Sequence, residues 1–360
     1  MSESVRWPSG APRAIAAFAL TFLLFSSAVS GQIFESLGTR ALGMGGAFVG
    51  VADDATAVYW NPAGLGSGAT FDLTLGQSLT EQVRGRGQAA SPESAATGGP
   101  ATFFGLAIPS FGLSYYRLRL SEVRVPANPT AGGAPDRQDH RNQWAVLSSL
   151  TTDQVGVTLV QSLLDGLVVG ATVRLVRGAA AIQPVLTGQP PEVLLGEAER
   201  LGGQVSTKGD LDAGAMANVG SFRLGVVARN LFEPRFETGS GGLQTHRQVR
   251  LGAAVTPGLA AADRVADEHG FIIALDLDAT RTPTSVGDRR GAAIGVERWW
   301  LRRRIGTRGG VRASTVGAPR PVGTLGVSVG PLRGVFVEGQ ICRGGQDADR
   351  GWSVSGRLTF

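Results

Sequence analysis

The feature that most constrains the fold is a series of short segments in which apolar and polar residues alternate. Each of the clearest is about ten residues long, and turn residues separate it from the next. These segments are 167–177, 221–231, 247–256, 271–280, 289–299, 322–330 and 334–341. In one of them, Ile273 and Leu275 share one face, while Asp276 and Asp278 share the other. The alternation predicts an all-β chain whose strands have one apolar and one polar face.

Two architectures accommodate such strands, a membrane-spanning barrel and a soluble β-sandwich. After Gly31 no apolar run approaches the about 20 residues of a spanning helix, so a chain that crosses a membrane must do so as a closed barrel. The mean hydropathy of +0.07 and the charged fraction of 18% suit alternating lipid-facing and lumen-facing residues. A sandwich would give similar values. Cys342 is the only cysteine, which excludes an intramolecular disulfide.

The N-terminus has the pattern of an export signal. Arg6 and Arg13 precede the apolar stretch 14–25, and the small residues 28–30 offer a cleavage site before Gly31. The apolar stretch is shorter than the about 20 residues that span a bilayer as a helix. We therefore predict a cleaved signal peptide over residues 1–30, with a single anchoring helix as the alternative.

The last ten residues alternate as well. Trp352, Val354, Leu358 and Phe360 fall on one face, and polar residues occupy the other. A strand that is apolar on one face and ends the chain on an aromatic residue is typical of an outer-membrane barrel. We assign these four residues to a membrane-assembly strand and expect outer-membrane lipid and the barrel-assembly machinery as partners. An ordinary half-buried strand is the alternative.

The basic residues do not indicate a nucleic-acid partner, although the formal net charge is +5. Most are scattered arginines, and the one dense run, 302–304, follows Trp299 and Trp300 directly. Basic residues next to tryptophan are typical of an anchor at the membrane–water interface. We assign Trp144, Trp299 and Trp300 to an interfacial aromatic girdle.

The number of strands supports a barrel. If 142–163 is one long strand, the count is about 14, an even number as single-chain bacterial barrels require. Short turns are expected at 109–110, 164–166, 219–221, 300–302 and 330–332. Long loops are expected at 81–101, 122–140, 178–208, 232–245, 281–288 and 342–350, with a further long connection, 257–269, on the short-turn side. If 142–163 is two strands, the count becomes odd.

A segment rich in small residues lies between the signal and the first strand. Its glycine cluster lets the backbone pack closely, its acidic pair can cap a short helix, and its Asn-Pro step would end that helix. A compact insert of this kind suits a hatch over residues 31–69, inside a barrel formed by residues 70–360. The residues that we assign to the hatch and its gating are Gly43, Gly45, Gly46, Asp53, Asp54, Asn61, Pro62 and Ala63.

This segment closely resembles the N-terminal hatch of the FadL-type outer-membrane transporters and their PorV-like relatives. The shared pattern combines a Gly-Met-Gly-Gly-Ala run, an Asp-Asp-Ala step and the tripeptide Asn61-Pro62-Ala63. The resemblance implies a transmembrane antiparallel β-barrel of about 14 strands, with a short helical hatch in the lumen. It also implies a location in the cell outer membrane.

The resemblance leaves two functions open. FadL-type members allow passive passage of hydrophobic small molecules of the fatty-acid or hydrocarbon class, and this is our leading prediction. PorV-like members are accessory barrels of type IX protein secretion, and here the outer loops would bind secretion-system proteins. The patterns at 229–231, 250–252 and 309–312, together with Glu297, look more like the PorV-like branch. No loop motif allows ligand-pocket residues to be assigned.

Enzyme motifs are weak in this chain. The Gly-x-Ser-x-Gly pattern around Ser328 would need a strand-to-helix turn, but Ser328 lies in the middle of an alternating strand. His140, His246 and His269 lack the spacing of a metal site. We therefore expect no catalytic residue, no metal and no cofactor.

Several charged residues fall on the predicted inner face of the barrel. They could line a polar pathway, or they could brace the lumen and the hatch, because buried charges need partners. The second interpretation is favoured. These residues are Arg174, Arg250, Asp276, Asp278, Glu297 and Glu338.

Overall fold

The structure, a computed structural model, describes residues 34–88, 91, 94–125, 143–257, 270–317, 319–345 and 349–360. The predicted signal peptide lies outside these ranges, as do His140, His269 and nearly all of the predicted connection 257–269. The alternation of the C-terminal residues and the hatch motif lie within them.

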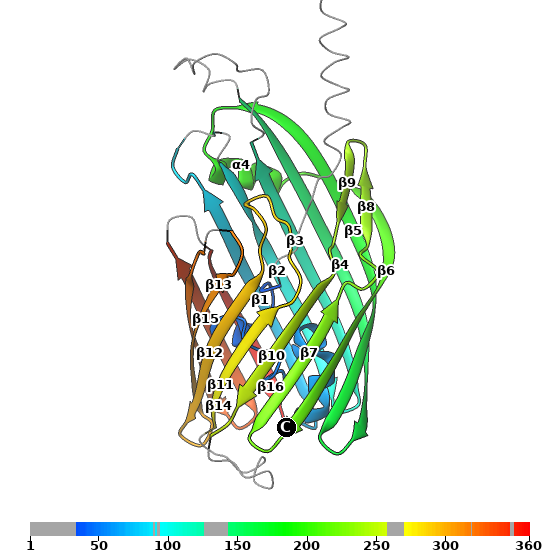
Figure 1. Cartoon of the computed structure of the whole chain (residues 1–360), viewed down its shortest axis with the longest axis vertical. Helices are drawn as coiled ribbons and strands as arrows, with labels where there is room; N and C mark the ends of the chain where they lie inside the picture. Colours follow the sequence, from blue (N-terminus) through cyan, green and yellow to red (C-terminus); the bar gives the residue numbers. More distant parts are fainter. Residues whose placement is uncertain are drawn as a thin grey trace, which may run out of the picture.

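Fourteen of the described strands form one closed antiparallel barrel, in the order β1-β16-β15-β14-β13-β12-β11-β10-β7-β6-β5-β4-β3-β2 (Figure 1). Its first seven strands are β1 (Asp72–Arg84), β2 (Ala95–Ile108), β3 (Phe111–Arg124), β4 (Gln143–Leu164), β5 (Leu167–Thr187), β6 (Gln204–Val219) and β7 (Phe222–Arg229). The others are β10 (Gln248–Val255), β11 (Phe271–Asp278), β12 (Gly291–Trp300), β13 (Ile305–Ser314), β14 (Val322–Leu332), β15 (Val335–Gly344) and β16 (Arg350–Thr359). The predicted fold class and strand number are confirmed, and 142–163 is indeed one strand.

The barrel closes where β1 pairs with β16. The register runs from Asp72 opposite Thr359 to Glu81 opposite Arg350. Phe71 and Phe360 exchange backbone hydrogen bonds of 3.3 and 3.0 Å at the end of this seam. Because every strand then has two neighbours, the sheet has no open edge along these strands.

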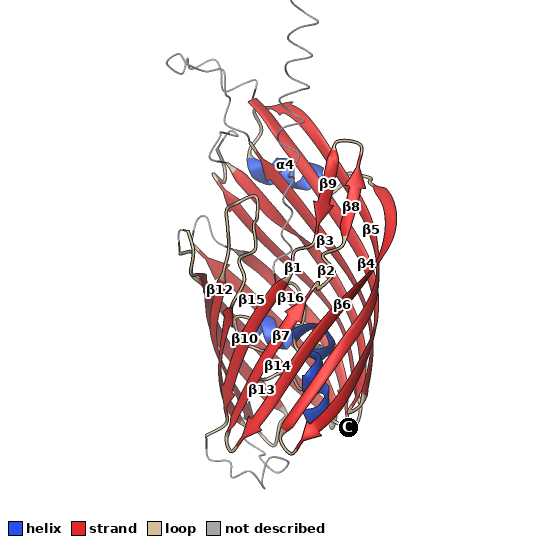
Figure 2. Cartoon of the chain, turned by 45° about the vertical axis from the view of Figure 1, so that its right-hand side comes forward, coloured by secondary structure: helices blue, strands red, loops and turns tan. Residues whose placement is uncertain are grey.

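The wall is much taller on one side than on the other (Figures 1 and 2). β4 has 22 residues and β5 has 21, whereas β7 and β10 have 8 each. A strand needs only about 9–11 residues to cross a bilayer, so β4 and β5 extend well beyond it. The predicted loop 178–208 is therefore wrong in part: β5 runs on to Thr187, the helix α4 (Pro191–Ala198) follows, and β6 starts at Gln204. A small hairpin of β8 (Arg235–Thr238) and β9 (Gly241–Gln244) stands beside the tall strands.

The outer face of the barrel is apolar. In β14, Leu325, Val327 and Val329 are exposed, whereas Thr324 and Ser328 are buried on the inner face. This is the alternation that the sequence predicts for a transmembrane barrel. Among the helices of the described residues, none is long and apolar enough to cross a bilayer.

The inside of the barrel is filled by the N-terminal residues 34–68, which we call the luminal segment. It contains α2 (Thr39–Gly43), α3 (Ala57–Trp60) and the 3-10 helix η1 (Pro62–Ser67), which lie within the half of the barrel that holds the C-terminus (Figure 2). Its core is a group of packed aromatic rings, with centroid distances of 5.2 Å for Phe34–Trp60 and 5.9 Å for Phe48–Trp60. Tyr59 joins this core to the wall through Tyr116, at 5.6 Å.

Candidate functional site: the luminal segment and its ion-pair networks

Two helices of the luminal segment, α3 and η1, are set by local polar side chains. Asp54 Oδ1 accepts a 2.9 Å hydrogen bond from the Thr56 amide, which holds the turn before α3. Asn61 ends α3 and begins η1, because its Oδ1 accepts from the Ala63 amide at 3.2 Å and Pro62 needs no donor at the first helical position. The predicted helix ending at the Asn-Pro step is observed. The acidic pair does not cap this helix as predicted: its N-cap residue is Thr56, with no side-chain cap hydrogen bond, and Asp54 holds the turn just before it.

Asn61 also links two parts of the luminal segment to each other and to the barrel wall. Its side-chain amide donates to the Val49 carbonyl at 3.0 Å and to the Ala215 carbonyl of β6 at 3.2 Å. A Cβ atom at Gly214 would lie 2.1 Å from Asn61 Oδ1, so only glycine fits beside it. One buried side chain thus joins two parts of the segment to the barrel.

The glycine cluster of the segment packs backbone against backbone. Gly45 and Gly46 have φ values of 71° and 87°, a conformation that favours glycine. The turn that they form presses on two wall glycines: a Cβ at Gly295 would lie 2.3 Å from the Met44 carbonyl oxygen, and one at Gly310 would lie 2.4 Å from the Met44 carbonyl carbon. The wall glycines were missed from the sequence, because nothing local distinguishes them from other strand glycines.

A buried ion-pair network centres on Arg40 of α2, and we call it the Arg40 network. Arg40 binds Glu297 of β12 through two hydrogen bonds of 2.8 and 2.7 Å and also pairs with Asp53. Arg308 of β13 donates to the same Glu297 at 2.6 Å. Around this centre lie Asp54, Glu338 and Arg357, with nitrogen–oxygen distances of 3.7 Å for Arg357–Asp54 and 3.3 Å for Arg308–Glu338.

A second network, the Glu35 network, holds the start of the segment. Glu35 accepts from Arg250 of β10 at 2.6 Å and from Arg289 at 3.2 Å. Arg250 in turn binds Asp278 at 2.5 Å, and Arg289 binds Asp349 at 3.1 Å. Burial alone would raise the pKa of Glu35, but the two arginines outweigh it and hold that pKa well below its usual range.

The wall contributes further contacts to the segment. Asp276 Oδ2 accepts from the Phe48 and Val49 amides, each at 2.9 Å. Arg229 lies over the Tyr59 ring, 3.4 Å from its centroid. Arg174 makes its contacts within the wall: it binds Asp210 at 2.5 Å, Asp212 at 2.7 Å and, at 2.6 Å, the hydroxyl of Tyr116, whose ring packs on Tyr59 of the segment.

The inward charges predicted from sequence therefore brace the lumen. Arg174, Arg250, Asp276, Glu297 and Glu338 are all buried, and each has at least one polar partner. Removing a single member would leave an opposite charge buried without its full set of partners. The predicted inner face was correct, but the central residue of the network, Arg40, was not singled out.

The assignment of Trp299 to the interfacial aromatic girdle is wrong. Trp299 is only 1% exposed, donates to Glu297 Oε1 at 3.0 Å and packs on Phe336 with ring centroids 5.4 Å apart. Consecutive residues of a strand point to opposite faces, so Trp299 and Trp300 could not both meet lipid. Trp300 and Trp144 are exposed, at 41% and 42%.

The C-terminal strand shows the predicted alternation. Trp352, Val354 and Phe360 are exposed, Leu358 is partly exposed, and the intervening Ser353 is buried. A contribution of this face to membrane assembly stays a prediction.

Ser328 lies within β14, with no helix after it. Its hydroxyl donates to Glu338 Oε1 at 2.7 Å, and Arg308 donates to Ser328 at 2.5 Å. In the described part of the chain, no group of three or more histidine, cysteine, aspartate or glutamate side chains is placed to hold a metal ion.

Comparisons with known proteins agree with the barrel. The toluene transporter TbuX of Ralstonia pickettii superposes with a TM-score of 0.56 at 14% identity, over 91% of this chain and 99% of that one. The monoaromatic hydrocarbon channel CymD gives 0.59 at 14% identity, over 90% and 98%. A Pseudomonas aeruginosa FadL homologue gives 0.55 at 12% identity, also over 90% and 98%. At these identities the likeness establishes the fold.

Sequence comparisons add little. The family model described as "F plasmid transfer operon, TraF, protein" matches residues 196–278, a minor part of the chain that lies between α4 and β11. A search of curated proteins found no match. The chain is thus a transmembrane β-barrel with the fold of the FadL-type channels, and the resemblance that the hatch motif suggests is confirmed at the level of the fold.

Proposed function

We propose that this protein is an outer-membrane channel for passive passage of hydrophobic small molecules of the fatty-acid or hydrocarbon class. The observation that carries the proposal is the luminal segment: an aromatic-cored plug inside a barrel, held by a few buried contacts. The solved structures that share the fold are described as a toluene transporter, a hydrocarbon channel and a FadL homologue, which supports the same function.

In this proposal the luminal segment is the hatch. Its buried core keeps water and ions from crossing, since an apolar, closely packed interior leaves them no hydrated path. A hydrophobic solute crosses when the segment shifts locally, and Asn61 and the Arg40 network return it to one position. The glycine turn at residues 43–46 lets the segment move against the wall without side-chain collisions. Export by a cleaved signal peptide over residues 1–30 belongs to the same proposal, and the intact mass of the purified protein tests it.

The test is uptake of radiolabelled oleate and toluene by cells that lack their own FadL-type transporter. The intact protein should restore uptake of at least one of them. Asn61→Ala removes three hydrogen bonds, of about 1 kcal/mol each, and should lower that uptake while the barrel still assembles. Asn218→Ala, the same change at the β6–β7 turn, is the matched control and should leave uptake unchanged.

Two results would argue against this function. If Asn61→Ala transports as well as the intact protein, the luminal segment is not the hatch. If the intact protein restores uptake of neither oleate nor toluene but purifies with stoichiometric secretion-system proteins, an accessory role in type IX secretion replaces the proposed channel function.

A further inference from the structure

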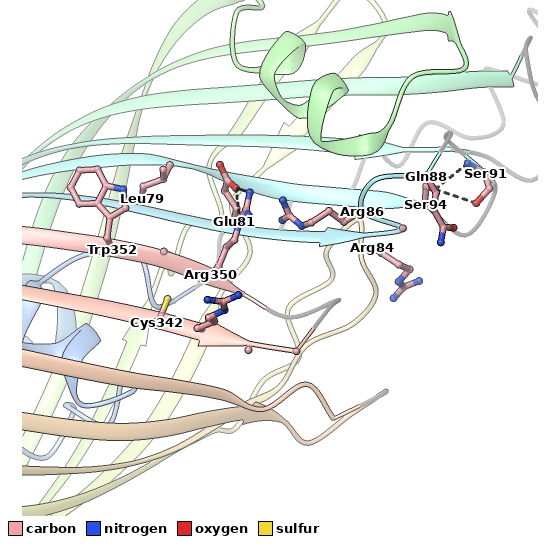
Figure 3. Close-up of a pocket in the computed structure, with 15 residues that line it drawn as sticks. Leu79, Glu81, Arg84, Arg86, Gln88, Ser91, Ser94, Cys342, Arg350 and Trp352 are labelled. Carbon is pink, nitrogen blue, oxygen red and sulfur yellow. Dashed lines mark hydrogen bonds and ion pairs between the residues drawn. The ribbon is translucent and has the colours of Figure 1, made fainter.

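The rim of the barrel has a cleft at the seam between β1 and β16. β16 begins at Arg350, opposite Glu81, whereas β1 continues to Arg84. β1 therefore stands above β16, and a cleft of about 1130 Å³ opens beside it, between β1 and the ends of β15 and β16 (Figure 3). It lies at the loop-rich end of the barrel, away from the short turns.

The cleft carries an excess of positive charge. Among the described residues that line it are four arginines, Arg84, Arg86, Arg343 and Arg350, and a single carboxylate, Glu81. Arg350 forms an ion pair with Glu81: its Nε and Nη2 atoms lie 3.2 and 3.1 Å from Glu81 Oε2. Arg84 donates to the Val286 carbonyl at 2.5 Å, which leaves its charge unneutralised. Among the residues that the structure describes, Arg86 and Arg343 have no carboxylate within ion-pair distance.

An apolar edge lies below these charges. Leu79 and Trp352 line the cleft on the side of the membrane, and Figure 3 places them at the opposite end from Ser91 and Ser94. Trp352 is 43% exposed on the outer face of β16. The cleft therefore has a basic upper part and an apolar lower part, as the headgroup boundary of a membrane has.

Arg343 connects the cleft to a second hollow on the outer wall. This groove, about 610 Å³ in volume, crosses β12 to β15 and is walled by Ile294, Val311, Leu325 and Ile341. Gly309 and Gly323 form its floor: a Cβ at either position would have its nearest neighbour at 3.8 Å, so a side chain could be accommodated there without a clash. Most of the lining is glycine and aliphatic side chains, which suits an acyl chain.

We propose that the cleft and the groove together bind a phosphate-bearing, acylated lipid of the outer leaflet. The lipid phosphate would lie against Arg86 and Arg343, because arginine donors match phosphate oxygens in geometry and charge. Arg84 is not part of this contact, since it shares the inner face of β1 with Gln82 and donates to Val286 there. One acyl chain would lie in the glycine-floored groove below Arg343. Arg343 and the groove face lipid on the outer wall, so the site is independent of passage through the lumen.

The test is native mass spectrometry of delipidated protein to which bisphosphorylated lipid A is returned in mild detergent. The intact protein should retain lipid A and should not retain the same lipid with its phosphates removed. Arg86→Gln with Arg343→Gln should weaken retention about tenfold or more, since charge-assisted hydrogen bonds are lost. Arg177→Gln with Arg200→Gln, which changes an exposed arginine of β5 and an exposed arginine of the turn after α4, should retain lipid A normally.

Gly309→Leu tests the groove separately, because the added side chain points to lipid and fills the floor. It should weaken retention of lipid A and leave binding of a deacylated, phosphorylated headgroup unchanged. Heat-modifiable migration on a gel verifies that each variant forms the barrel. Equal retention by the Arg86/Arg343 variant and its control would overturn the proposal. So would equal retention of the dephosphorylated lipid, which indicates general lipid contact, or displacement by inorganic phosphate at equal concentration, which indicates a free-anion site.

Discussion

At the scale of single residues, the luminal segment depends on side chains that each make several buried contacts. Asn61 joins the turn at Val49, the start of η1 and the wall at Ala215. Arg40 joins α2 to Asp53 and to Glu297. Such residues cannot be replaced even by chemically similar ones. A buried polar group that loses its partner destabilises the fold by more free energy than the hydrogen bond itself contributes.

Replacing Arg40 with Ala should release the luminal segment. Glu297 and Asp53 would keep their charges with fewer partners, and breaking a buried pair costs about 3–5 kcal/mol. We expect higher ion conductance in planar bilayers, with the barrel still folded. Arg117→Ala removes an arginine that is 53% exposed and lies 3.7 Å from Asp153, so its conductance should match that of the intact protein. Equal conductance of both variants would show that the Arg40 network does not hold the segment.

The segment should stay docked in mild acid. Burial opposes ionisation of Glu35 and Asp53, but Arg250 and Arg40 outweigh it and lower the pKa of both carboxyls. A carboxyl with a lowered folded pKa stabilises the fold fully above its unfolded pKa of about 4, and that stabilisation is lost as the pH falls through the folded pKa. The contribution of these two carboxyls should therefore be constant from neutral pH to about pH 5 and be lost only below about pH 4, where conductance should rise. No rise below about pH 4 would contradict this assignment.

At the scale of the elements, wall glycines determine where the segment can lie. The Met44–Gly46 turn contacts β12 and β13 through Gly295 and Gly310 without any intervening side chain. The strands themselves follow from alternation, yet β5 and β6 extend into a stretch that reads as a loop. Their extra residues rise above the bilayer, where water removes the need for an apolar outer face, so the alternating pattern weakens although the backbone pairing continues.

Gly310→Val tests this contact between elements. Its Cβ would overlap the Met44 backbone at 2.4 Å, and backbone cannot move aside as a flexible side chain can. The segment should shift from the wall, with raised conductance and faster protease cleavage of residues 34–68 in the folded barrel. Gly309→Val, whose Cβ would have 3.8 Å to its nearest neighbour, is the adjacent control and should behave as the intact protein. If the two variants are indistinguishable, the backbone contact does not position the segment.

At the scale of the whole molecule, closure of the barrel depends on the seam between the first and last strands. β1 and β16 are far apart in the sequence and pair along their full common length. Phe360 completes the seam, through its backbone bonds to Phe71 and a ring-centroid distance of 6.2 Å. An unclosed barrel would expose unpaired backbone groups to lipid, so closure determines whether the molecule is stable in a membrane.

Phe360→Ala should reduce the amount of assembled barrel in the outer membrane, measured as the heat-modifiable fraction. The substitution removes the terminal aromatic side chain at the seam and leaves the backbone pairing possible. Phe232→Ala changes a phenylalanine that is equally exposed, at 67%, but lies in the connection after β7, and it should assemble normally. Normal assembly of Phe360→Ala would remove the terminal aromatic residue from the assembly signal.

Features that depend on residues close together in the sequence could be predicted from it. Alternation indicated the strands, their inner and outer faces and the number of strands in the barrel, and the Asn-Pro step indicated the end of a short helix. The alternation of consecutive strand residues between the two faces, applied to Trp299 and Trp300, would have placed one of them inside the barrel. The wall residues that meet the luminal segment are known only from the folded barrel, because those partners are remote in the sequence: Arg40 and Glu297 are 257 positions apart. Such pairings are selected by packing and charge in the closed barrel, where the buried charges have to find partners.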